Sequence, residues 1–185
     1  MRWFWIDRFT EFVCGSHAVA VKGVSLSEDH MHEHMVGYPI MPNSLVTEGM
    51  AQAGGLLVSE QYGFGELVVL GKLAKAKFHS CVRNGETLTY RVKVDSIRES
   101  GAAVTATAHV GERLHAEALL FYARLSGEAD PLEGAKLFRP RDLQHWLSLV
   151  GVFEVGLRED GTPMQESDYP LEENPTGAPP CDDES

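Results

Sequence analysis

The chain has 185 residues, of which 43% are hydrophobic and 23% are charged, and its formal net charge is −11. This length and balance are typical of one globular domain with a small appendage. No apolar run approaches the ~20 residues that cross a bilayer, and the basic patch with interleaved aromatics that nucleic-acid binding requires is missing. We therefore expect neither a membrane span nor a nucleic-acid partner.

The negative charge is concentrated towards the C-terminus. Residues 1–126 carry 12 Lys and Arg against 13 Asp and Glu, whereas residues 127–185 carry 4 against 14. The three cysteines lack CxxC spacing and cannot make a full disulfide framework. The apolar run at the N-terminus is too short, and an acidic residue follows it too early, for the core of a signal peptide. We therefore expect a cytoplasmic protein.

The N-terminal residues alternate as paired strands do. Residues 8–13 and 17–24 are predicted strands around a turn at Gly15. A polar loop follows, and Pro39 and Pro42 prevent regular structure just after it.

A long helix is predicted over residues 43–61, with Asn43 or Ser44 as its N-cap. Its interior is rich in glycine and alanine, which lowers helix propensity. Small residues all round a helix indicate that other backbone packs closely against it. We expect this helix to be buried, wrapped by a sheet.

The chain after the helix consists almost wholly of predicted strands, over residues 67–77, 87–98, 102–110 and 113–125. Short turns between consecutive strands predict an antiparallel sheet. A long central helix with such a sheet is an α+β architecture, with the helix on one face. Residues 1–126 form the predicted domain.

The remaining chain has a different character. Residues 127–157 are a predicted extension, with a short amphipathic helix over 139–152. Residues 158–185 are acidic and rich in proline and glycine, and we expect them to be a disordered tail.

One stretch carries a chemical signal. From Met35 to Ser59 the only formal charge is Glu48, and a lone carboxylate is costly to bury unless it is paired, hydrogen-bonded or protonated. The candidate partner is His34, fourteen positions earlier. Together they suggest a His/Glu acid–base pair that works near neutral pH.

These residues resemble the hotdog-fold 3-hydroxyacyl-[acyl-carrier-protein] dehydratase (FabZ-like) family. Its pattern, H-F-P-x-x-P-x-x-P-G and then L-x-x-E-x-M-A-Q, corresponds without a gap to residues 34–52, which read H-M-V-G-Y-P-I-M-P-N-S-L-V-T-E-G-M-A-Q. Similar flanking segments extend the resemblance over residues 3–125. The chain departs from the pattern at Met35, Val36 and Asn43.

The resemblance implies a hotdog fold and dehydration of (3R)-3-hydroxyacyl thioesters to trans-2-enoyl thioesters, with no metal or redox cofactor. His34 would be the base and Glu48 the acid, with Gln52 orienting Glu48 and the Asn43 amide binding the carbonyl oxygen. It also implies at least a homodimer, in which His34 of one subunit faces Glu48 of the other. The thioester would be carried by acyl-carrier protein or coenzyme A.

Two other groups of side chains are open to more than one interpretation. Alternate histidines at positions 30, 32 and 34 would point the same way on a strand and suggest a metal site, but nothing at recognisable spacing completes one. A local concentration of basic residues is either a solvated strand edge or a docking site for an acidic carrier. Its members are Lys72, Lys75, Lys77 and Arg83.

Two rival functions stay open. A hotdog acyl-thioesterase would hydrolyse the thioester, and a non-catalytic module would bind an acyl carrier or acyl chain without turnover. A specialised lipid or polyketide pathway would keep the dehydration chemistry.

Overall fold

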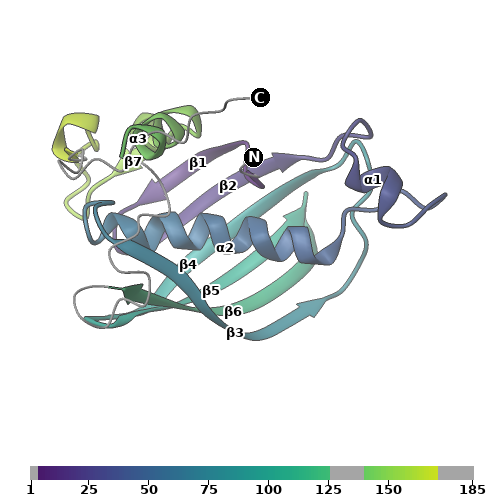
Figure 1. The fold of residues 1–185 in the computed structure, drawn as a ribbon, viewed down its shortest axis with the longest axis horizontal. Coiled ribbons are helices and arrows are strands. Elements are labelled where there is room, and N and C mark those ends of the chain that lie inside the picture. The colour runs from purple at the N-terminus through teal and green to yellow at the C-terminus, as the bar shows by residue number, and fades with distance from the viewer. Residues whose placement is uncertain (1–3, 126–139, 171–185) are drawn as a thin grey trace, which may run out of the picture.

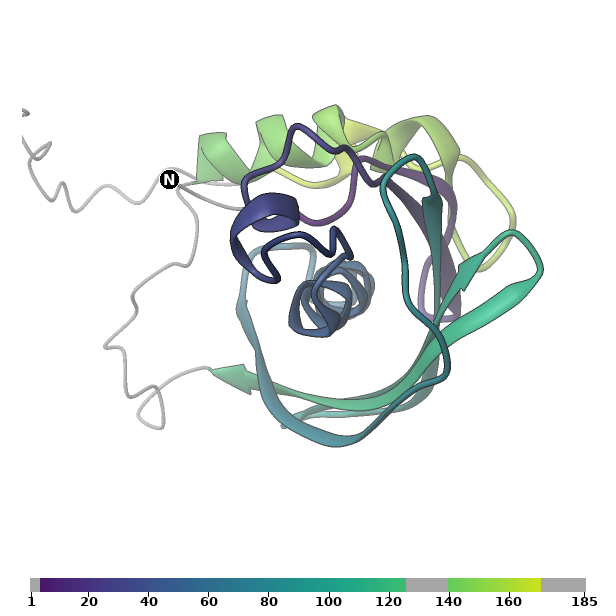
Figure 2. The ribbon, with the colours of Figure 1, turned by 90° about the vertical axis from the view of Figure 1, so that its right-hand side faces the viewer.

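A computed structural model of the chain describes residues 4–125 and 140–170. A seven-stranded sheet curls around the long helix α2 (Asn43–Glu60), as Figure 1 shows from the side and Figure 2 shows along the helix. The strand order is β3-β6-β5-β4-β2-β1-β7. This is the expected α+β architecture.

The strands lie close to their predicted positions. In chain order they are β1 (Arg8–Val13), β2 (His17–Gly23), β3 (Leu67–Phe78), β4 (Thr87–Arg98), β5 (Gly101–Val110), β6 (Arg113–Leu125) and β7 (Gly156–Leu157). Neighbouring strands pair antiparallel, except that β7 runs parallel to β1.

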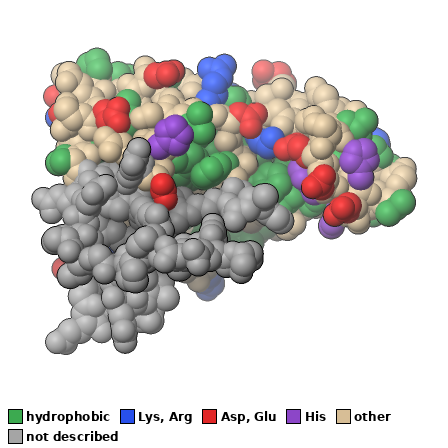
Figure 3. All heavy atoms as spheres, turned by 45° about the horizontal axis from the view of Figure 1, so that its top comes forward, with side chains coloured by type: hydrophobic (Ala, Val, Ile, Leu, Met, Phe, Trp, Pro, Cys, Tyr) green, Lys and Arg blue, Asp and Glu red, His purple; other side chains and the backbone are tan. Residues whose placement is uncertain are grey.

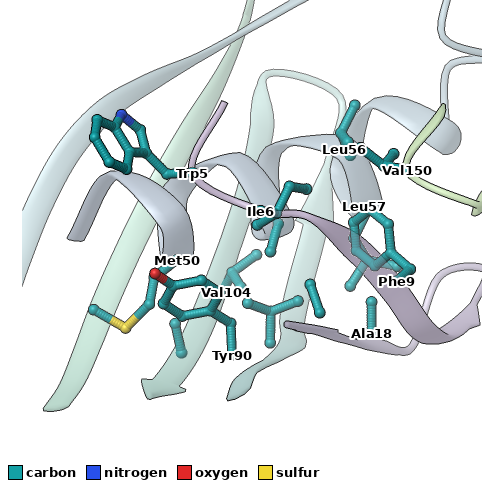
Figure 4. Close-up of a cluster of buried hydrophobic side chains, with 14 of the residues drawn as sticks. Trp5, Ile6, Phe9, Ala18, Met50, Leu56, Leu57, Tyr90, Val104 and Val150 are labelled. Atoms are coloured by element: carbon teal, nitrogen blue, oxygen red, sulfur yellow. The ribbon is translucent and has the colours of Figure 1, made fainter. Parts of the chain in front are cut away.

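The core lies between the sheet and α2. On β4, Leu88, Tyr90 and Val92 are buried and alternate with more exposed residues, because successive side chains of a strand point to opposite faces. Figure 4 shows Tyr90 and Val104 of the sheet beside Met50 of the helix. Burial of this apolar face holds the sheet and the helix together.

Glycines in α2 admit tyrosine rings rather than backbone, which corrects the sequence-based expectation. A Cβ at Gly49 would lie 2.5 Å from the ring and hydroxyl of Tyr90, and one at Gly54 would lie 2.6 Å from the Tyr122 hydroxyl. The Tyr122 hydroxyl donates to the Ala51 carbonyl at 2.7 Å. The same glycines that lower the helix propensity of this segment therefore let the two tyrosines pack closely against α2.

The helix cap also differs from the prediction. The N-cap position is Pro42, and no side chain caps the helix. Pro42 is suited to this boundary because its carbonyl accepts from the amides of Leu45 and Val46, while its ring keeps residue 42 itself out of the helical hydrogen-bond ladder.

The C-terminal extension packs against β1. Its helices are α3 (Pro140–Leu149) and α4 (Val152–Val155), and a 3-10 turn, η2, covers Glu166–Asp168. Part of the segment that we expected to be disordered is thus ordered. The apolar Met164 and Tyr169, which are 2% and 9% exposed, provide the buried contacts that the overall acidic composition conceals. Residues 126–139 and 171–185 lie outside the described residues.

Polar and sulfur contacts attach this extension to the end of α2 and to the end of β1. The Tyr169 hydroxyl donates to the buried Glu60 carboxylate at 2.8 Å. The Cys14 thiol lies 3.4 Å from the Met164 sulfur, and burial raises its pKa to about 12. The thiol is therefore an inert packing group rather than a nucleophile.

No helix within the two described ranges is both long enough and apolar enough to cross a membrane.

The contact at Gly49 gives a first prediction. Gly49→Ala forces its methyl group into Tyr90, and overpacking of this kind lowers the free energy of unfolding by about 1–3 kcal/mol. Gly55→Ala is the matched control, because its Cβ would meet its nearest atom, of Tyr122, at an ordinary 3.4 Å. Denaturant unfolding of both variants checks this, and a Gly49→Ala protein as stable as the wild type would contradict it.

Buried His115 gives a second prediction. Burial lowers its pKa, so the unfolded chain takes up this proton first as the pH falls below about 6.5. The free energy of unfolding should therefore fall from pH about 6.5 towards the lowered pKa, and this group should have no effect above that range. Unfolding measured against pH should give a shallower acid slope for His115→Gln. The same change at the exposed His145 is the control, and equal slopes would refute the assignment.

Candidate active site

The N-terminus of α2 presents free backbone donors. Among the described residues, neither the amide of Asn43 nor that of Ser44 donates to a protein acceptor, as expected for the first turn of a helix. Phe64 is the only non-glycine residue of the described ranges with positive φ, so Asn43 has ordinary backbone geometry. An asparagine can therefore present its amide here without strain. These donors, with the positive end of the helix dipole, favour developing negative charge.

Glu48 lies on α2 and is oriented by two hydrogen bonds in series. The Gln52 Nε2 group donates to Glu48 Oε1 at 3.0 Å, and Gln52 Oε1 accepts from the backbone N–H of Trp5 at 2.8 Å. The contact between Glu48 and Gln52 is the predicted one between positions i and i+4. The Glu48 side chain is exposed in the single chain.

His34 is positioned by α1 (His30–Glu33), a short helix that the sequence analysis expected to be a loop. Its amide donates to the His30 carbonyl at 3.3 Å, and its side chain is exposed. The described residues include no hydrogen bond or ion pair between His34 and Glu48. Within one chain, both side chains are therefore exposed but are not hydrogen-bonded to each other.

An ionic network anchors the segment before α1. The Lys22 ammonium, on a residue only 7% exposed, donates to Glu28 Oε1 at 2.8 Å and lies 3.5 Å from Asp7. Burial acts to raise the pKa of Glu28, but hydrogen bonds from Lys22 and the Ser25 amide lower it overall. The network keeps an ionised carboxylate next to α1 and so restrains the helix that precedes His34.

Sequence reasoning missed this network. The available signal was Lys22 itself, a lysine in an otherwise apolar strand segment, because a lysine is almost never buried without a partner. Trp5 was missed for a different reason. It acts through its backbone N–H, which every residue type except proline supplies.

The three histidines lie on a helical turn and not on a strand, so the geometry behind the metal interpretation is wrong. His30 packs edge-on against Trp5, with 5.1 Å between ring centroids, and burial lowers its pKa. His32 Nε2 lies 2.5 Å from the Leu26 carbonyl oxygen. No group of at least three potential metal ligands occurs in the described part of the chain. Figure 3 shows histidine and acidic side chains gathered at the end of the molecule that carries α1.

The basic residues have separate surroundings. Lys72, Lys75 and Lys77 lie exposed along β3, where Lys75 pairs with Glu117 at 3.5 Å. Arg83 lies outside the strand and stacks over the Tyr38 ring. Docking of a carrier by these residues stays a prediction.

A model of the FabA-like domain family matches residues 4–118. The chain belongs to the FabA-like family. It is 34% identical over 119 residues to the 3-hydroxyacyl-[acyl-carrier-protein] dehydratase FabZ of Clostridioides difficile, an alignment that covers 64% of this chain and 84% of the relative. Membership of the FabA-like family and similarity to FabZ enzymes make this protein a dehydratase.

Solved structures confirm the hotdog fold of this FabA-like protein. A hot-dog-like protein from Thermanaerovibrio acidaminovorans matches with a TM-score of 0.54 and 19% identity, covering 63% of this chain and 86% of the other. The protein smu.793 from Streptococcus mutans, solved with acetyl-CoA bound, matches with a TM-score of 0.55 and 15% identity, covering 68% and 94%. At these identities the likeness is one of fold alone.

Proposed function

We propose that this protein dehydrates (3R)-3-hydroxyacyl thioesters to trans-2-enoyl thioesters in fatty acid or related lipid synthesis. His34 removes the C2 proton, and the electrons of that C–H bond form the C2=C3 double bond as the C3–O bond breaks. Glu48 donates its proton to the departing hydroxide, which leaves as water. The negative charge that develops on the thioester oxygen is stabilised by the amides of Asn43 and Ser44.

The observation that carries this proposal is the arrangement on α2. An oriented carboxylate, Glu48, follows the free amides of the same helix at Asn43 and Ser44 by about one turn. The relatives supply the substrate class, because FabZ enzymes are 3-hydroxyacyl-[acyl-carrier-protein] dehydratases by name. Neutral imidazole is a suitable base since its ordinary pKa is about 6.5.

The proposed site is completed by a second subunit. Both His34 and Glu48 are exposed in the single chain, whereas an acid that protonates hydroxide works best when it is shielded from water. A homodimer in which His34 of one subunit faces Glu48 of the other provides the missing partner and the cover.

The edge strand β3 supports such a dimer. Leu70 and Leu73 pair with Tyr122 and Leu120 of β6 and so share their face of the sheet. Tyr122 and Leu120 are buried, but Leu70 and Leu73 are 40% and 42% exposed. A long edge strand with exposed leucines is a template for pairing with another chain. The carrier, acyl-carrier protein or coenzyme A, would approach the basic side chains Lys72, Lys75, Lys77 and Arg83.

Variants at the two titratable residues test the chemistry. His34→Ala and Glu48→Gln should each lower kcat by at least about 100-fold, the usual contribution of general acid–base catalysis. The assay follows enoyl absorbance with 3-hydroxyacyl thioesters of varied chain length on both carriers. His32→Ala is the matched control because His32 lies on the same short helix and should keep wild-type activity.

The same assay separates the rival functions. Release of free thiol without enoyl absorbance would identify a thioesterase. Binding of acyl-carrier protein without turnover, unchanged by His34→Ala, would identify a non-catalytic module. Either result would overturn the proposal.

Mixed dimers test the shared site. His34→Ala and Glu48→Gln subunits are each inactive alone, but each mixed dimer has one intact site. Random reassortment makes half of the dimers mixed, so activity should recover to about a quarter of the wild-type value. Recovery is measured after co-refolding, with sedimentation to establish the dimer. A mixture that forms dimers and stays inactive would show that the residues do not act across subunits.

A further inference from the structure

The Gln52 side chain has a determined orientation. A backbone N–H can only donate, so the amide oxygen of Gln52 faces Trp5 and its NH₂ group faces Glu48. Glu48 Oε1 is therefore held as an acceptor. A proton on this carboxyl group belongs on Oε2, which leaves that oxygen as the donor to a leaving hydroxyl group.

The position of Trp5 depends on packing as well as on the sheet, because the first hydrogen bond to the sheet, from the Asp7 amide to the Val21 carbonyl at 2.7 Å, lies two residues further along the chain. Residues 4–6 precede β1 and are not part of a strand. Trp5 and Ile6 are 7% and 2% exposed, and Figure 4 shows both against α2.

The extension supplies part of this packing. The Phe4 ring stacks on Trp146 of α3, with 4.6 Å between centroids and 27° between planes. Trp146 is itself only 5% exposed. The Val150 carbonyl, one residue beyond α3, accepts from the Phe9 amide at 2.8 Å, so this part of the extension is fixed to β1. Val150 also shares the buried cluster with Leu56 of α2 (Figure 4).

We infer that the C-terminal extension is a working part of the active site, in which Trp146 fixes Phe4 and Trp5 and thereby orients Gln52 and Glu48. This inference rests on the proposed role of Glu48 as the acid. Trp146 and Gln52 are positioning residues, since neither needs to touch the substrate. Loss of the ring at position 146 should let the Trp5 amide move and misdirect the Glu48 carboxyl group.

The test uses full-length variants and steady-state kinetics. Trp146→Ala should lower kcat about tenfold with little change in KM, because displacement of a catalytic group by a fraction of an ångström is costly although binding is unaffected. Trp146→Phe keeps an aromatic ring on Phe4 and should restore most of kcat. Leu149→Ala is the matched control on α3, because Leu149 is 65% exposed.

A double-mutant cycle distinguishes positioning from general stability. If Trp146 acts through Gln52, then Trp146→Ala should have little further effect on kcat once Gln52 is replaced by Ala. Additive losses, or an unchanged kcat in Trp146→Ala, would overturn the inference. Thermal unfolding accompanies each variant. If Trp146→Ala does not fold, Phe4→Leu replaces it in the cycle and is judged by the same criterion.

Two different results distinguish a missing role of the extension from a wrong assignment of the enzyme's activity. A wild-type protein that dehydrates no 3-hydroxyacyl thioester would remove the proposed function. A wild-type protein that dehydrates and a Trp146→Ala variant that turns over equally fast would remove only the role of the extension.

Discussion

The packing of two tyrosines against two glycines of α2 is the constraint on which the rest of the structure depends. Tyr90 and Tyr122 reach the helix only where Gly49 and Gly54 carry no side chain. This contact determines how closely the sheet curls around the helix. Between the two glycines, on the same helix, lies Gln52, and Glu48 lies next to the first of them. The packing that closes the core therefore also determines where the carboxylate is placed.

The candidate site depends on the difference between the two sides of α2, one buried and one exposed. Val46, Met50 and Leu57 are buried, whereas Asn43 and Glu48 are exposed near its N-terminus. Burial of one side supplies the rigidity that a catalytic group needs, and the exposed side presents the amides and the carboxylate. Near His34, the buried Lys22 network has a similar restraining role among the described charged groups. Its ion pairs from Lys22 to Glu28 and Asp7 add to the apolar packing of the neighbouring buried Val24 and Met31.

Much of this arrangement could be predicted from the sequence, where local pattern and tertiary structure agree. The bounds of β4 and β6 match their predictions because alternation and turn residues specify both. The short helix α1 could not be predicted, since four residues carry no helical period and the polar composition is typical of a loop. The order of residues 158–170 was missed because a few buried contacts, at Met164 and Tyr169, outweigh the acidic composition. The link from Trp5 to Gln52 could not be predicted, since a backbone donor leaves no trace in residue identity.

The pairing of β7 with β1 has a consequence for how copies of the chain can associate. A sheet with two free edges can add strands without limit, which is the route to fibres. Here β7 pairs with the end of β1, and its own Leu157 is bridged to Pro163, whose ring removes a backbone donor. One side of the sheet is thereby shielded where β7 lies, while β3 stays open. The homodimer proposed above would use the open β3 edge, so that each copy would cover the exposed edge of the other.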